Sequence, residues 1–141
     1  MSSCCENSFL VEGRREEVLR FARENSVEGQ LRFALSLPPP SGQTAAWNER
    51  NWGVSREVND SALEVFENKA VSRFETVATP PRYWFMFLVR KYSRLHLEIA
   101  YRDRTHNYSG FVAAKKGQVF THAQGAYDAY SLHDHHWASL C

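Results

Sequence analysis

Two segments of the chain decide its fold: WNERNWG at residues 47–53 and RFETVATPP at residues 73–81. In the first, two tryptophans stand five positions apart before a glycine, which predicts a rigid packed corner whose indole and amide donors need partners. In the second, the double proline ends a strand and sets the direction in which the next helix leaves. We therefore expect a structural motif made of Trp47, Asn51, Trp52, Gly53, Pro80 and Pro81.

The composition is that of one soluble globular domain. The chain has 141 residues, of which 43% are hydrophobic and 23% are charged, and this length suffices for one hydrophobic core. The formal net charge is only +1, so no overall positive field draws the protein to nucleic acid. The sequence has neither an apolar run of about 18 residues nor the order of a signal peptide. We expect a cytoplasmic protein with no membrane contact.

Three cysteines lie at the two ends of the sequence: Cys4, Cys5 and Cys141. An odd number without a regular spacing does not indicate a disulfide framework, and it favours reduced thiols in a reducing compartment. The pair Cys4-Cys5 has no neighbouring base in the sequence that would activate it, so we expect inert thiols.

Hydrophobic periodicity predicts an α+β fold. A helical period marks residues 14–25 and 82–93. Alternation predicts strands or extended segments over residues 8–12, 31–37, 95–102, 108–115 and 118–122, and a hairpin of 63–67 with 71–77 around Asn68 and Lys69. Helices and strands do not alternate strictly along the chain. We therefore expect an antiparallel sheet with two helices packed on one face, in a ferredoxin-like arrangement.

The regular pattern ends at residue 122. We expect one domain over residues 1–122 and a C-terminal tail, rich in His and Tyr, over residues 123–141. The weak candidates for metal ligands in this tail are His133, His135 and His136. A metal site needs further ligands, which only His122 or Cys141 could supply nearby, so we predict no metal and no cofactor.

Several residues of the chain match, in type and in order, the sequence pattern of a known protein family. They are Asn7, Val11, Gly13, Phe21, Leu31, Phe33, Leu37-Pro38, Trp47, Asn51-Trp52-Gly53, Phe74-Glu75-Thr76, Pro80-Pro81, Tyr101, Ser109-Gly110 and Gly117. In these positions the chain resembles the YubB-type ferredoxin-like proteins, which plasmids and bacteriophages carry. The chain departs from this family at Val54-Ser55-Arg56, where the family has Thr-Lys-Trp, and at Val77-Ala78, where it has Ala-Trp. The resemblance implies a ferredoxin-like fold and a mobile-element origin, but no catalytic residue set.

The helix predicted over residues 82–93 has two different faces. Trp84, Phe85, Leu88, Val89 and Tyr92 form a stripe that we expect to face the core. The other side carries Tyr83, Met86 and Phe87 with arginines, a combination typical of partner-binding surfaces unless a loop or the tail covers it. Residues 82–116 are also rich in Lys and Arg. The predicted partner-binding residues are Tyr83, Phe87, Arg90, Arg94, Arg102 and Arg104.

These observations favour binding over catalysis. The sequence lacks a nucleophile elbow, a phosphate loop and a His-Glu-x-x-His motif. With the family resemblance, we expect a phage- or plasmid-encoded interaction protein that docks on a host protein or ribonucleoprotein complex and inhibits a host defence complex, in the manner of an anti-CRISPR protein. Two alternatives stay open: a nucleic-acid-binding module that uses exposed aromatics and a basic face, and a small metal-dependent hydrolase or nuclease that uses the His-rich tail.

Overall fold

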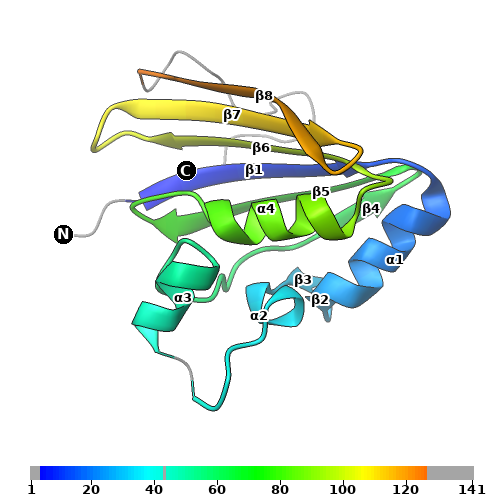
Figure 1. Ribbon diagram of the computed structural model, residues 1–141, viewed down its shortest axis with the longest axis horizontal. Coiled ribbons are helices and arrows are strands. Elements are labelled where there is room, and N and C mark those ends of the chain that lie inside the picture. The colour runs from blue at the N-terminus through cyan, green and yellow to red at the C-terminus, as the bar shows by residue number, and fades with distance from the viewer. Residues whose placement is uncertain (1–3, 43, 127–141) are drawn as a thin grey trace.

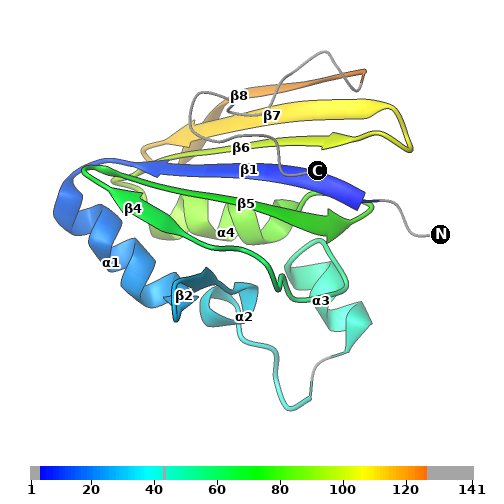
Figure 2. The same ribbon diagram turned by 180° about the vertical axis from the view of Figure 1, so that it is seen from behind.

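The structure is a six-stranded sheet with all of its described helices on one face (Figures 1 and 2). The computed structural model describes residues 4–42 and 44–126. The strands follow the order β4-β5-β1-β6-β7-β8, and each neighbouring pair is antiparallel. They are β1 (Cys4–Glu12), β4 (Glu64–Phe66), β5 (Lys69–Val77), β6 (His96–Asp103), β7 (Tyr108–Lys115) and β8 (Gln118–Gly125). The α+β class that we predict is confirmed.

The described part of the chain has four helices, two more than we predict. They are α1 (Arg15–Asn25), α2 (Phe33–Ser36), α3 (Ala45–Asn51) and α4 (Arg82–Lys91). A separate small hairpin, β2 (Ser26–Val27) with β3 (Gln30–Leu31), joins α1 to α2. We call the face of the sheet that carries these helices the helix face.

Aromatic rings fill the layer between the sheet and the helices. The ring of Phe9, on the central strand β1, lies 5.1 Å from the ring of Trp84 on α4. The ring of Phe33, on α2, lies 4.7 Å from the same tryptophan. All three side chains are fully buried. The core is therefore centred on Trp84, whose ring contacts connect helices α2 and α4 to the sheet.

The two segments that decide the fold meet at the start of α4. The Trp52 carbonyl oxygen accepts hydrogen bonds from the amides of Tyr83 and Trp84, each 3.2 Å long. These amides belong to the first turn of the helix, whose donors have no partner within the helix itself. Gly53 has a φ of +93°, and a Cβ there would lie 3.0 Å from the Arg82 nitrogen. Glycine is therefore required where the tryptophan corner caps α4.

The predicted packed corner is the end of a short helix. Trp47 lies in α3, and Trp52 follows its last residue. The Trp52 indole is fully buried, and its Nε1 donates to the Leu37 carbonyl oxygen over 3.0 Å. Its ring packs edge-on against Trp47 with 6.0 Å between ring centroids. The corner is confirmed as packed, and its indole donor has the partner that burial requires.

Segment 31–37 differs from the expected extended conformation, because residues Phe33–Ser36 form helix α2. The cause is a carboxylate distant in sequence. The Glu57 carboxylate accepts hydrogen bonds from the backbone amides of Phe33 and Ala34, 2.7 and 2.8 Å long. An acceptor at the first turn of a helix pairs otherwise orphaned amides. The alternating apolar pattern of this segment was therefore a misleading signal for its backbone.

The end of the described chain extends past the boundary that we predict. Strand β8 continues to Gly125, three residues beyond residue 122. The rest of the predicted tail, with His133, His135 and His136, lies outside the described residues. Within residues 4–42 and 44–126, we find no helix with the length and apolar character needed to cross a membrane.

Candidate binding groove

A groove opens between α4 and the last three strands. Strands β7 and β8 extend the sheet beyond β6, so part of their helix face lies beside α4 instead of beneath it (Figure 1). The turn between β7 and β8 packs against the end of α4, since a Cβ at Gly117 would lie 3.6 Å from Ser93. The space that remains toward the start of α4 has a volume of ≈ 210 Å³.

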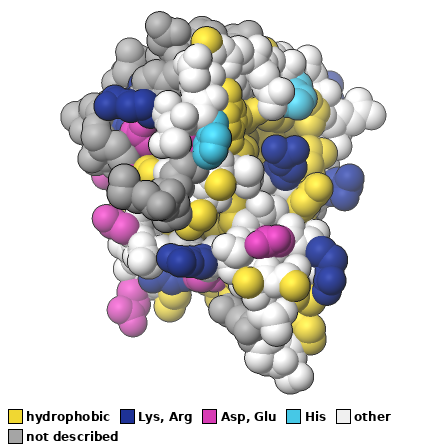
Figure 3. Space-filling view, turned by 90° about the vertical axis from the view of Figure 1, so that its left-hand side faces the viewer, with side chains coloured by type: hydrophobic (Ala, Val, Ile, Leu, Met, Phe, Trp, Pro, Cys, Tyr) yellow, Lys and Arg dark blue, Asp and Glu magenta, His cyan; other side chains and the backbone are white. Residues whose placement is uncertain are grey.

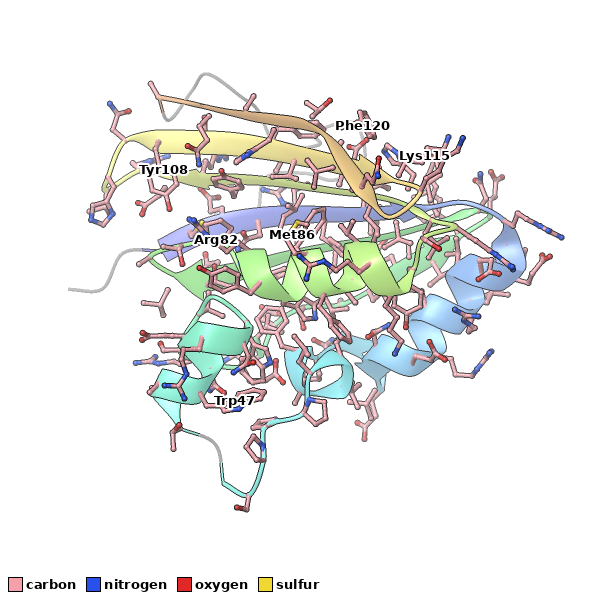
Figure 4. All side chains as sticks on the ribbon, in the orientation of Figure 1. Trp47, Arg82, Met86, Tyr108, Lys115 and Phe120 are labelled. Atoms are coloured by element: carbon pink, nitrogen blue, oxygen red, sulfur yellow. The ribbon has the colours of Figure 1, made fainter. Side chains whose placement is uncertain are left out.

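Most of the groove lining is apolar. Strands β6 and β7 contribute Ile99, Tyr101 and Val112, α4 contributes Tyr83, Phe85 and Met86, and Pro80 and Val119 complete the apolar part. Three polar residues join them: Arg82, His122 and Gln124. Figure 3 shows hydrophobic side chains in a hollow flanked by His and by Lys or Arg side chains. In Figure 4, Arg82 and Met86 extend from the side of α4 that is nearest the strands.

The groove floor is held in place by Tyr101. Its hydroxyl oxygen accepts a hydrogen bond of 2.9 Å from the Gln124 side-chain amide on β8. Its ring lies directly over Gly110 on β7, where an added Cβ would come within 2.8 Å of the Tyr101 Cε2 atom. Tyr108 packs against the same ring at 6.0 Å between centroids. The floor is thus formed by contacts within the protein and needs no ligand to shape it.

A buried polar cluster lies beside Tyr101 at the end of the sheet. Cys5 and Asp103 are paired across β1 and β6, and both are fully buried. The Asp103 carboxylate contacts the His106 ring over 2.8 Å. Burial raises the pKa of the Cys5 thiol to about 12, and the negative charge of Asp103 acts in the same direction. The Cys5 thiol therefore stays protonated near neutral pH, whereas Cys4 is exposed.

We expect the free energy of unfolding to fall between pH 9.0 and about pH 12. In the unfolded chain the Cys5 thiol ionises near its ordinary value of 9.0, but in the folded protein only at about 12. Below pH 9.0 the thiol is protonated in both states, so its contribution to stability is fully present. This contribution is lost as the pH rises from 9.0 to about 12. Denaturant unfolding across this pH range measures the effect.

The matched variants for this measurement are Cys5→Ala and Cys4→Ala. Cys5→Ala is expected to flatten the alkaline slope, and Cys4→Ala is expected to leave it unchanged. Burial also raises the pKa values of Tyr92 and Tyr108, so a smaller slope should persist in Cys5→Ala. Equal slopes in both variants would contradict the assignment to Cys5.

Of the predicted partner-binding residues on α4, only Tyr83 lines the groove. Its side chain is 51% exposed. Phe87 is half-buried against the core, and the Lys91 ammonium lies 5.9 Å from its ring. Arg90 is exposed but does not line the groove. The half-buried Met86, which we expect on the outer side of the helix, is part of the groove wall instead.

The other predicted arginines lie elsewhere. The Arg94 guanidinium is 3.3 Å from the Glu17 carboxylate of α1. Arg102 alternates with Tyr101 along β6, so it lies on the face of the sheet opposite the helices, where its Nε donates to Glu6 over 3.2 Å. Arg104 follows β6 in the turn before β7. The prediction that Arg102 belongs to one partner-binding surface with Tyr83 is therefore corrected, because the two residues lie on opposite sides of the sheet.

Within the part of the chain that the structure describes, no three His, Cys, Asp or Glu side chains come together in a way that could hold a metal. Comparison with protein-family models, curated proteins and solved structures found no match. The family resemblance and the mobile-element origin therefore stay predictions.

Proposed function

We propose that this protein acts by binding another protein, and that the groove beside α4 receives an apolar side chain of that partner. One observation carries the proposal: an apolar depression of ≈ 210 Å³ is open at the surface and bordered by Tyr83. Large exposed aromatics next to preformed pockets are typical of the centres of protein interfaces. The ring of Tyr83, 51% exposed, would become buried on binding.

The size of the groove favours one side chain over a whole small molecule. Sites for drug-sized ligands have volumes of about 300–1,000 Å³, which is more than the ≈ 210 Å³ found here. A dry cavity of about 150 Å³ is known to hold benzene. The groove therefore has room for one Phe- or Leu-sized side chain, while the rest of the partner stays outside.

The polar groups at the groove indicate what lies next to that side chain in the partner. Arg82 is exposed, and its guanidinium makes no ion pair among residues 4–42 and 44–126. An arginine of this kind can hold a carboxylate with two parallel hydrogen bonds. We propose a partner segment with an acidic residue close to its apolar anchor.

The proposed fold relationship explains how the groove arises. If α2, α3 and the β2–β3 hairpin count as insertions between α1 and β4, the remaining elements β1-α1-β4-β5-α4-β6 would follow the βαββαβ order of a ferredoxin-like domain, with β7 and β8 added at one edge. We propose that this added hairpin supplies the outer wall of the groove. From the resemblance alone, we take the partner to be a host protein or ribonucleoprotein complex, with inhibition of host defence as the biological role.

Tyr83→Ala is expected to weaken partner binding by about 30-fold or more, the loss typical of an interface hot spot. The partner would be captured from a nuclease-treated bacterial lysate on the immobilised protein and identified, and its affinity for the variants would then be measured. Leu35→Ala is the matched control, because Leu35 is also a large exposed side chain, at 45%, and lies on α2 outside the groove. Equal affinity of the two variants would reject the groove.

A second measurement tests the groove without the natural partner. Indole imitates an aromatic side chain, and its addition should shift the methyl NMR signals of Met86 and Val112 but not that of Leu35. If indole shifts none of the groove methyl signals at saturating concentration, the groove does not accept an apolar group and the proposal is wrong.

A further inference from the structure

The two edges of the sheet differ in their protection. Strand β4, at one edge, has only three residues, begins with Glu64 and is followed by Glu67. Short edge strands with charged residues resist pairing with other strands. Strand β8, at the opposite edge, has eight residues, QVFTHAQG, with no proline and no Asp, Glu, Lys or Arg. It therefore lacks proline and charged side chains, two of the features that normally prevent an edge strand from pairing.

Strand β8 itself exposes two apolar side chains, although Lys115 and Lys116 lie in the segment directly before it. Phe120 is 60% exposed, the largest value among the exposed large hydrophobic side chains of the described chain. Val119 beside it is 37% exposed. Figure 4 shows Phe120 projecting from the outermost strand. Strand β8 is the last strand of the sheet, and no strand among the described residues pairs with the amides and carbonyls on its outer side.

We propose that β8 pairs in antiparallel fashion with β8 of a second copy of this protein, which gives one continuous sheet across a symmetric dimer. This inference is independent of the proposed function. The pairing segment is Thr121–Gly125, because a register shift opposite Ala113 and Ala114 disturbs the first part of the strand. Regular pairing with β7 from Thr121 to Gly125 leaves that part straight enough to accept another strand.

The occupant is a second copy because β8 is compatible with itself. A two-fold axis places the same residues of both copies close together, and like charges directly opposite each other destabilise a strand pair. The uncharged β8 meets this condition, whereas β4 would bring Glu64 and Glu67 of the two copies together.

Charge reversal at the middle of the pairing segment tests the dimer. Ala123 lies between Thr121 and Gly125 and does not line the groove. We expect the wild-type protein to sediment as a dimer, and Ala123→Lys and Ala123→Glu each to sediment as monomers. An equimolar mixture of the two variants is expected to form dimers again, because opposite charges then face each other. This rescue also shows that both variants are folded.

Val65→Lys is the matched control, since it places the same charge on the other edge strand, β4. It should remain dimeric. A wild-type monomer across concentrations from about 1 μM to about 1 mM, an unchanged dimer in Ala123→Lys, or no rescue on mixing would each overturn the inference. A wild-type monomer that dimerises only after deletion of residues 127–141 would identify that segment as the occupant of the edge, and would equally overturn it. A monomer that still captures the partner would leave the proposed function intact.

Discussion

Replacing Trp52 with alanine is expected to lower the free energy of unfolding by about 3–5 kcal/mol, the usual cost of removing a fully buried tryptophan side chain. The indole is fully buried, with the Phe33 ring at 5.6 Å and the Trp47 ring at 6.0 Å between centroids. Its loss also leaves the Leu37 carbonyl oxygen without the indole donor. Denaturant unfolding followed by circular dichroism measures the change, which corresponds to a decrease in Tm of about 10–17 °C.

Two further variants separate the contributions of Trp52. Trp52→Phe keeps an aromatic ring but removes the donor to Leu37, so it should cost about 1–3 kcal/mol, less than alanine. Trp47→Ala is the matched control, because Trp47 contributes to the same ring contact but is only partly buried. If Trp47→Ala proves as destabilising as Trp52→Ala, the buried indole is not what holds the corner.

The parts of the fold that the sequence predicts are those that local patterns control. The inward stripe of α4, from Trp84 to Tyr92, is buried as its helical period indicates. The hairpin of β4 and β5 also follows its pattern, although Glu67 and Asn68 form the turn, one position earlier than expected. In both cases neighbouring residues alone determine the conformation.

Helix α2 shows where such patterns fail. Apolar and polar residues alternate in this segment as they do in a strand. Glu57, more than 20 positions away, nevertheless accepts hydrogen bonds from the two backbone amides that start the helical turn. No local signal in residues 31–37 reports this contact. Tertiary hydrogen bonds can override a weak local preference, and they do so here.

The groove was missed for a different reason. The alternation of Ile99 and Tyr101 correctly marks one apolar face of β6, and Val112 faces the same side on β7. Periodicity does not say how far a sheet extends beyond the helix above it, so it cannot separate covered positions from open ones. Strand parity would, however, have placed Arg102 on the opposite face from Tyr101. That signal was present in the sequence.

Gly110→Ala is expected to lower the free energy of unfolding by about 1–3 kcal/mol, the cost of overpacking, and to close the groove. The added Cβ would overlap the Tyr101 ring, coming within 2.8 Å of its Cε2 atom. The ring must then move away from the sheet into the groove, which breaks its hydrogen bond with Gln124. Unfolding measurements give the first effect, and the loss of indole-induced shifts at Met86 gives the second.

A double-mutant cycle isolates this contact. In a Tyr101→Ala background there is no ring to displace, so Gly110→Ala should hardly change the free energy of unfolding. The coupling free energy between the two positions should then equal most of the effect of Gly110→Ala alone. Tyr101→Phe removes the hydroxyl oxygen, the Tyr101 atom nearest the added Cβ, but keeps the ring, so it is expected to leave part of the cost. If Gly110→Ala costs the same with and without the Tyr101 ring, the glycine serves the strand itself, and the floor of the groove does not depend on the ring lying over Gly110.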